Sequence, residues 1–226
     1  MVNAGMQPRE ALREVEARLT AAGCPDADFD AGELFRLVTG QDARLADMPL
    51  TAEQAAKLEV LTARRATREP LQYLCGSWPF LDFELAVGPG VLCPRADTEV
   101  VAEAAAQMLA GVQAPKVLDL CAGTGCLGLG VKRFCPEADV TCVEKSPEAF
   151  RYLKKNAVSA LKQGTARAVE GDLFHYWQGL PEGELDLIVS NPPYLTAAEM
   201  QQLQPEVARE PAMALEAGED GLVFYR

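Results

Sequence analysis

Asp119-Leu-Cys-Ala-Gly-Thr-Gly-Cys-Leu-Gly128 is a glycine-rich turn that joins a predicted strand to a predicted helix. Gly123, Gly125 and Gly128 follow the G-x-G-x-x-G spacing, in which glycines let the backbone approach a ligand beside a helix N-terminus. Glu144 follows about 20 residues later, at the end of the next predicted strand, where a carboxylate can accept hydrogen bonds from ribose hydroxyls. The turn therefore predicts a nucleotide-type cofactor, and both nicotinamide cofactors and S-adenosylmethionine satisfy it.

Four predicted strands alternate with helical patterns after Pro115. The strands cover residues 116–120, 139–144, 166–170 and 185–190. One of the helices opens at Ser146, an N-cap residue followed by Pro147 and Glu148, which are both favoured in a first helical turn. Strand and helix alternation of this kind predicts an α/β fold with a parallel, doubly wound sheet.

The first 69 residues predict a small bundle of helices. Apolar residues have helical spacing in 7–22 and 29–39, and Thr51-Ala-Glu-Gln54 reads as a capping box that opens a third helix. We interpret 1–69 as a helical domain for packing or substrate docking. Aromatic and branched residues then predict a β-hairpin linker within 70–95, and a helix near 98–109 begins the α/β domain, 96–226.

Charge and composition exclude several classes of protein. The 226 residues contain 21 Lys and Arg against 33 Asp and Glu, a formal net charge of −12. A broad nucleic-acid footprint needs a basic face, so this charge balance counts against DNA or bulk RNA as the main partner, and we expect no direct nucleic-acid partner. The sequence shows no secretory leader, membrane span or C-x-x-C pair, and we expect a cytoplasmic monomer with reduced thiols and no metal.

Ser190-Asn191-Pro192-Pro193-Tyr194 follows the fourth predicted strand, at the sheet edge where open α/β folds bind ligands. An amide nitrogen is a poor nucleophile because its lone pair is delocalised. The Asn191 side chain and the Pro192 carbonyl could accept its two N–H hydrogens and hold the nitrogen in line with a methyl donor. The motif is typical of methyltransferases that act on amino groups and favours S-adenosylmethionine over a nicotinamide cofactor.

Several further motifs resemble the HemK/PrmC family of release factor protein-(glutamine-N5) methyltransferases. They are Glu69-Pro-Leu-Gln-Tyr73-Leu-Cys-Gly76, Phe80 to Phe83, Val91-Leu-Cys-Pro94-Arg95-Ala-Asp-Thr98-Glu99 and Gly218-Glu-Asp-Gly221-Leu-Val-Phe-Tyr-Arg226. The resemblance covers essentially the whole chain. It implies a class I, Rossmann-like S-adenosylmethionine-dependent methyltransferase domain, with S-adenosylhomocysteine as product. The implied substrate is the glutamine of the Gly-Gly-Gln loop in class I peptide release factors.

The resemblance also implies roles for individual residues. The expected catalytic residues are Asn191 and Pro192, and Asn191, Pro192, Pro193 and Tyr194 are expected to bind the substrate glutamine. The expected cofactor-binding residues are Asp119, Cys121, Ala122, Gly123, Thr124, Gly125, Glu144, Asp172, Leu173 and Asn191. Cys121 replaces the family's first loop glycine, and we expect it to avoid positive φ.

Three points remain open at the sequence level. Many relatives have an aromatic residue where Leu173 stands, which predicts weaker adenine packing. Arg95, Thr98 and Glu99 have no assigned role, and ion pairs across the domain junction would explain them equally well. Four strands are three fewer than a complete class I sheet contains, so we expect a C-terminally incomplete domain whose fourth strand forms an exposed edge.

The alternatives are an N6-adenine DNA or RNA methyltransferase, which shares the Asn-Pro-Pro-Tyr chemistry, and a cofactor-binding but inactive protein. A nicotinamide dehydrogenase fits the glycine turn but not Asn191 to Tyr194.

Overall fold

The chain folds into two compact units in a computed structural model that describes residues 1–162 and 164–226. The first unit contains Met1–Cys75 together with the distant segment Pro205–Arg209, and the second contains Gly76–Gln204 and Glu210–Arg226. This division differs from the expected boundaries, because the predicted linker is not a separate unit. Its hairpin belongs to the second unit.

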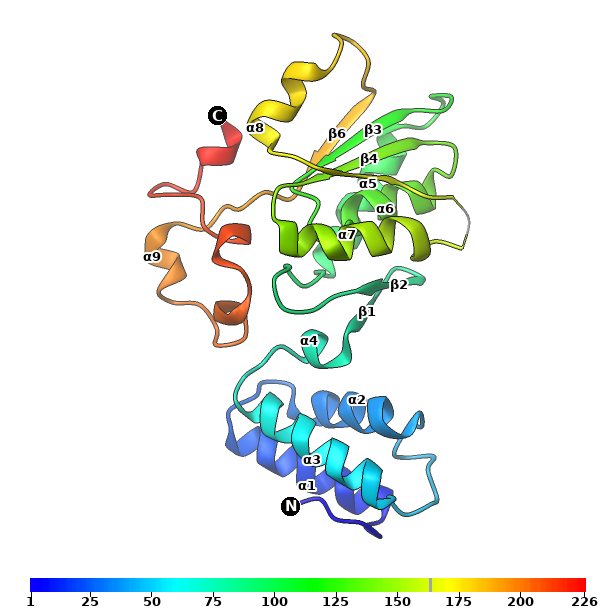
Figure 1. Cartoon of the computed structure of the whole chain (residues 1–226), viewed down its shortest axis with the longest axis vertical. Helices are drawn as coiled ribbons and strands as arrows, with labels where there is room; N and C mark the ends of the chain where they lie inside the picture. Colours follow the sequence, from blue (N-terminus) through cyan, green and yellow to red (C-terminus); the bar gives the residue numbers. More distant parts are fainter. Residues whose placement is uncertain (163) are drawn as a thin grey trace. The chain divides into compact units, whose positions relative to one another are not determined.

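The first unit is a bundle of helices, as the sequence predicts (Figure 1). Its helices are α1 (Pro8–Ala21), α2 (Ala27–Thr39), α3 (Ala52–Ala66) and α4 (Leu71–Cys75). Thr51 and Gln54 form the predicted capping box at the start of α3. The prediction missed α4, which lies inside the stretch that we assigned to the hairpin linker. Burial of Leu71, Tyr73 and Leu74 explains this helix better than local propensity does.

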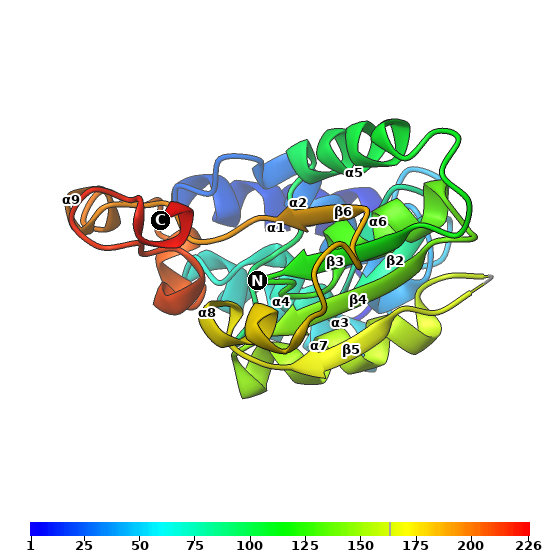
Figure 2. The same ribbon diagram turned by 90° about the horizontal axis from the view of Figure 1, so that it is seen from above.

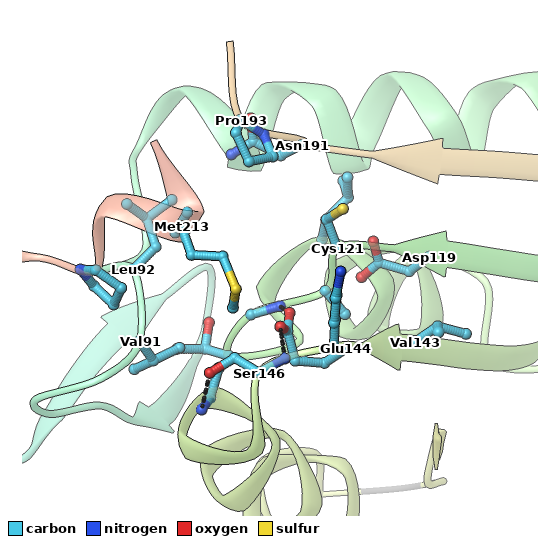
Figure 3. Close-up of a pocket in the computed structure, with 18 of the residues that line it drawn as sticks. Val91, Leu92, Asp119, Cys121, Val143, Glu144, Ser146, Asn191, Pro193 and Met213 are labelled. Atoms are coloured by element: carbon cyan, nitrogen blue, oxygen red, sulfur yellow. Dashed lines mark hydrogen bonds between the residues drawn. The ribbon is translucent and has the colours of Figure 1, made fainter. Parts of the chain in front are cut away.

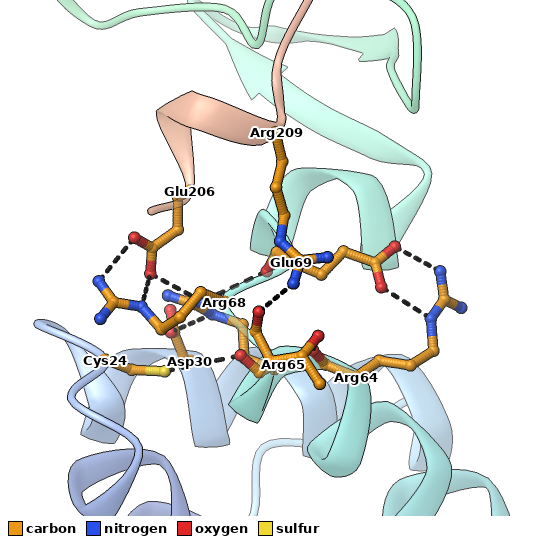
Figure 4. Close-up of polar contacts among 9 residues, drawn as sticks. Cys24, Asp30, Arg64, Arg65, Arg68, Glu69, Glu206 and Arg209 are labelled. Carbon is orange, nitrogen blue, oxygen red and sulfur yellow. Dashed lines mark hydrogen bonds and ion pairs between the residues drawn. The ribbon is translucent and has the colours of Figure 1, made fainter. Parts of the chain in front are cut away.

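A buried ion-pair network ties the segment 205–209 into the first unit (Figure 4). The guanidinium of Arg65 lies 2.7 Å from an Asp30 oxygen and 2.9 Å from a Glu206 oxygen, and its side chain is only 4% exposed. Arg68 donates both of its hydrogen bonds to the same Glu206 carboxylate, each at 2.6 Å. Bidentate Arg–carboxylate pairs fix geometry as well as charge, so Glu206 holds this segment in place.

The second unit is built on a parallel sheet of four strands in the described chain. The strands are β3 (Lys116–Leu120), β4 (Asp139–Glu144), β5 (Arg167–Glu170) and β6 (Leu187–Ser190), in the order β5-β4-β3-β6. The predicted bounds of β3 and β4 are confirmed, and β5 and β6 begin one and two residues late. The fourth predicted strand, β6, lies at an edge of the sheet, as expected.

Three helices cover one face of this sheet (Figures 1 and 2). They are α5 (Asp97–Met108), α6 (Cys126–Phe134) and α7 (Pro147–Ser159). Their apolar side chains share one core with the inward residues of the strands, including Val117, Cys142 and Val189. Burial of this kind supplies most of the folding free energy of such a layer, at roughly 25 cal/mol per Å² of apolar surface.

A two-stranded antiparallel hairpin, β1 (Ser77–Phe80) with β2 (Phe83–Ala86), packs on α6 through Phe80, Phe83 and Leu129. Short helices complete the unit. They are α8 (Leu173–Tyr176), α9 (Ala197–Met200) and the 3₁₀ turns Trp177–Gly179, Ala212–Ala214 and Val223–Tyr225. No helix of the described residues has both the length and the apolar character needed to span a bilayer.

Candidate active site

A pocket opens at the carboxyl ends of β3, β4 and β6, within the second unit (Figure 3). Parallel strands bring their carboxyl ends to one edge of a sheet, which is where ligands of open α/β folds bind. Most of the residues that the sequence selected line this pocket: Asp119, Cys121, Ala122, Gly123, Thr124, Glu144, Asp172, Leu173, Asn191 and Pro193. Gly125, Pro192 and Tyr194 are absent from its lining.

The glycine loop has the left-handed backbone that nucleotide-binding turns need. Gly123 has φ 56° and Gly125 has φ 84°. Cys121 also has positive φ, at 57°, so our expectation that it would avoid this region is wrong. Two hydrogen bonds fix the neighbouring residues, from Ala122 N to Val143 O and from Gly123 N to Glu144 Oε2. They outweigh a left-handed penalty of roughly 1–2 kcal/mol for a residue with a Cβ.

Gly128 has a packing role that differs from the conformational role of Gly123 and Gly125. A Cβ added to it would lie 2.6 Å from Cys142 Sγ and 2.9 Å from Asp119 Oδ2. Such distances would force the Cys142 and Asp119 side chains or α6 to shift. The third glycine of the motif therefore allows α6 to pack closely on the strands, and it does not line the pocket.

Glu144 is an organising residue of the pocket. Its Oε2 accepts a hydrogen bond from Gly123 N and its Oε1 accepts one from Ser146 N, both at 2.7 Å. Each carboxylate oxygen has a second lone pair, so both remain able to accept from a hydroxyl. The side chain thus joins the glycine loop to the start of α7, and the predicted ribose contact is compatible with this geometry.

Asp119 is a buried carboxyl beneath the loop. Its Oδ2 accepts a hydrogen bond from Gly128 N at 2.8 Å, while Oδ1 is buried without a partner among the described residues. Burial raises the pKa of Asp119 to about 7, and the nearby Glu144 charge adds to the rise against the Gly128 hydrogen bond. An unpaired buried acceptor in a pocket wall is a place where a ligand donor would relieve a desolvation cost.

Asp172 and Leu173 stand at the start of α8, on the side of the pocket formed after β5. Asp172 caps α8 through Phe174 N and pairs with Lys145 at 2.9 Å, and the Lys145 hydrogen bond lowers the pKa of this carboxyl. Phe174 stacks on Phe224 with ring centroids 5.5 Å apart, and both rings line the pocket beside Leu173. This wall is therefore more aromatic than Leu173 alone predicts.

Asn191 and Pro193 form the wall of the pocket that follows β6 (Figure 3). Pro192 is buried, whereas the Tyr194 side chain is largely exposed. The backbone here is closely packed, because a Cβ on Gly221 would lie 2.5 Å from the Tyr194 carbonyl oxygen. The structure thus brings the Asn-Pro-Pro-Tyr turn to the same edge as the glycine loop.

The residues of the 91–99 signature have contacts inside the second unit. Arg95 pairs with Glu210 at 2.6 Å inside the second unit, so the contact seen here is not the ion pair across the domain junction that the sequence left open. Glu99 accepts a hydrogen bond from Leu81 N at 2.7 Å and thereby fixes the hairpin turn to α5. Thr98 is buried and lines the pocket.

Sequence reasoning missed part of the lining. The pocket lining also includes Val91, Leu92, Phe174, Pro211, Met213 and Phe224. None of them carries a charge or belongs to a periodic pattern that would reveal a ligand contact. The only available signal was their position beside motifs such as Pro94-Arg95 and Gly221-Leu-Val-Phe.

The thiols of this pocket are unsuited to chemistry at neutral pH. Burial raises the pKa of Cys121 to about 12 and that of Cys126 to about 12, so neither is a ready nucleophile. Within the part of the chain that the structure describes, all seven cysteines are free, and no His, Cys, Asp and Glu cluster could hold a metal ion.

Comparison with known families agrees with this geometry. Residues 85–222 match the methyltransferase small domain, and residues 10–76 match the PrmC N-terminal domain. The release factor glutamine methyltransferase of Geobacter sulfurreducens is 44% identical over 183 residues, which cover 80% of this chain and 61% of that protein. The protein of the same name from Deinococcus radiodurans is 40% identical and covers 98% and 79%. The chain thus spans about three to four fifths of the length of these relatives.

Proposed function

We propose a function from one premise: this chain belongs to the release factor glutamine methyltransferase family. It transfers a methyl group from S-adenosylmethionine to the side-chain amide nitrogen of glutamine in the Gly-Gly-Gln loop of a class I release factor. The observation that carries the proposal is the placement of Asn191 in the wall of the pocket that the glycine loop also lines.

The pocket suits S-adenosylmethionine by its chemistry. Glu144 and Asp172 offer carboxylate acceptors for ribose hydroxyls and the adenine edge, and Leu173 with Phe174 offers an apolar wall for the base. The unpaired Oδ1 of Asp119 and the left-handed backbone at Gly123, which lines the pocket, suit the polar methionine end. When bound, this cofactor supplies a methyl group whose bond to sulfur breaks as its bond to nitrogen forms.

Asn191 and Pro192 orient the substrate amide. The Asn191 side-chain oxygen and the Pro192 carbonyl accept the two N–H hydrogens of the glutamine, which holds the nitrogen in line for attack. As the new bond to carbon forms, the nitrogen releases one of these protons to water, because the Asn191 and Pro192 oxygens are too weakly basic to keep it. Pro192 and Pro193 each have φ fixed by a ring, so the acceptor positions are set before the substrate arrives. Tyr194, largely exposed beside them, offers an aromatic surface that the glutamine loop can contact.

The partners follow from charge and family. The formal charge of −12 disfavours DNA or bulk RNA, so a protein loop is the better substrate for this pocket. Residues 10–76, the part that matches the PrmC N-terminal domain, dock the release factor. We expect the chain to act as a cytoplasmic monomer.

A labelling experiment tests the proposal. The protein is incubated with methyl-labelled S-adenosylmethionine and either an unmodified class I release factor or an adenine-containing oligonucleotide. We expect label on the Gly-Gly-Gln glutamine, located by mass spectrometry of the tryptic peptide. Label on adenine alone would establish the N6-adenine alternative, and retained cofactor binding without label would show an inactive protein.

A further inference from the structure

A strap of residues 210–217 connects two walls of the pocket. At its start Glu210 contacts the loop that contains Cys93 and Arg95, and in its middle Pro211, Met213 and Ala214 line the pocket. At its end Leu215 O accepts hydrogen bonds from Tyr194 N at 3.2 Å and Leu195 N at 2.9 Å. The strap therefore touches the backbone of the Asn-Pro-Pro-Tyr turn directly.

Glu210 is the anchor of this strap. Its carboxylate is 2% exposed, and both oxygens are engaged. Oε2 accepts from Cys93 N at 2.8 Å, and Oε1 accepts from Arg95 Nη2 at 2.6 Å. A buried carboxylate with a charged donor and a backbone donor holds one geometry, because any shift would leave a charge unpaired.

The other end of the strap is fixed by the backbone. Ala217 N donates to Leu195 O at 2.8 Å, and Leu195 forms a parallel bridge with Glu216. Gly221, just beyond the strap, lies so close to the Tyr194 carbonyl that no Cβ fits between them. Movement of the strap would therefore be transmitted to Tyr194 and, through rigid Pro192 and Pro193, to Asn191.

We propose that Glu210 is a positioning residue for methyl transfer, which acts through Arg95 and the strap to hold the Asn191–Tyr194 turn in its reactive geometry. This inference rests on the proposed function. It also assigns a role to Arg95, the signature residue that sequence analysis left open. A displacement of about 1 Å at a reacting group can lower a rate by about 100-fold, so a loosened strap has a measurable effect on kcat.

Glu210→Gln tests the proposal. The variant keeps an oxygen for Cys93 N but places an NH₂ group against the donors of Arg95, so the anchor weakens without a change in size. We expect kcat for methylation of an unmodified release factor to fall about 10- to 100-fold, with a smaller change in the Kd for S-adenosylmethionine. We also expect hydrogen exchange at the Tyr194 and Leu195 amides to accelerate at least 10-fold.

Asp82→Asn is the matched control, because Asp82 also pairs with an arginine in the second unit, Arg133, but lies far from the strap in the chain and outside the pocket lining. It should change neither kcat nor the rate of hydrogen exchange at the Tyr194 and Leu195 amides. Arg95→Gln serves as the second variant if Glu210→Gln does not fold, and the losses of the two variants should not add in the double variant.

The outcomes separate this inference from the proposed function. Unchanged exchange at Tyr194 and Leu195 in both variants overturns the positioning role, and so does an equal kcat loss in Asp82→Asn. If wild type does not methylate the release factor, the proposed function fails, and amide exchange alone then decides whether Glu210 holds the turn.

Discussion

Asp119 gives the protein a specific dependence on pH. Its pKa of about 7, raised by burial from an ordinary value of 3.8, means that the folded state keeps a proton that the unfolded chain has lost. Stability should therefore fall as pH rises from about 4 to about 7, by about 1.4 kcal/mol per pH unit, and level off above. Asp119→Asn removes this titration while its amide oxygen still accepts from Gly128 N. We expect urea unfolding at pH 5, 6, 7 and 8 to show a smaller loss of stability in the variant.

Glu84→Gln is the control for this series, because Glu84 is an exposed carboxylate of the same unit. An Asp119→Asn variant whose stability fell with pH as steeply as wild type would show that another group titrates.

Asn191 should affect turnover more than cofactor binding. Asn191→Ala removes a side-chain acceptor for the substrate amide, and the loss of one preorganised group of this kind costs about 10²–10³-fold in kcat. The Kd for S-adenosylmethionine, measured by titration calorimetry, should change by a much smaller factor. Asn3→Ala, in the helical unit, is the control and should leave both values unchanged. Equal losses in kcat and Kd would remove the orienting role of Asn191.

At the scale of elements, Asn156 joins three pieces of the second unit. It lies on α7 and is 2% exposed. Its Oδ1 accepts from Ala86 N at 2.8 Å, and its Nδ2 donates to Ala86 O and Thr124 O. Asn156→Ala leaves three backbone groups of β2 and the glycine loop unpaired, and each unsatisfied buried group costs about 1–3 kcal/mol. We expect the variant to lose about 3 kcal/mol or more in urea unfolding followed by tryptophan fluorescence.

Ser159→Ala, on the exposed end of the same helix, should change stability by about 0.5 kcal/mol or less. Similar losses in both variants would mean that α7 itself, and not the Asn156 bridge, limits stability.

The elements differ in how well the sequence predicted them. β3 and β4 were predicted to the residue because each is a short segment of mostly apolar and β-branched residues between turn residues. Leu71–Cys75 was missed because five residues with Tyr and Leu have little helical signal of their own, and burial decides their conformation. The strap was missed for a related reason. Residues 210–217 have no periodicity, and Glu210 acquires its role only when folding brings Arg95 beside it.

The residues of the candidate site also divide into those that the sequence could predict and those that only the fold reveals. Charged and glycine residues such as Glu144 and Gly123 have chemistry that can be inferred from their type and spacing. The positive φ of Cys121 was not inferred, although the glycine that the family has at this position was a signal for it. Apolar lining residues such as Met213 and Phe224 resemble any other core residue until the fold places them.

At the scale of the molecule, the helical unit and the cofactor pocket should be separable in stability. Every residue that lines the pocket belongs to the second unit. Both tryptophans, Trp78 and Trp177, also belong to that unit, so their fluorescence reports its unfolding, while far-UV circular dichroism also detects α1 to α3. Arg65→Met removes the cation between Asp30 and Glu206, and breaking a buried pair costs about 3–5 kcal/mol.

We therefore expect Arg65→Met to lower the midpoint of the first unfolding transition followed by circular dichroism. The free energy of unfolding measured by fluorescence should still rise when S-adenosylmethionine is added. The rise should be about 2.7 kcal/mol at a ligand concentration of 100 times Kd, because a ligand stabilises the unit that binds it. Arg64→Met is the matched control, since Arg64 pairs with Glu69 at the surface and should cost about 1 kcal/mol or less. If Arg65→Met abolished the cofactor-dependent shift, the pocket would depend on the helical unit for its integrity, and the assignment of cofactor binding to the second unit alone would be wrong.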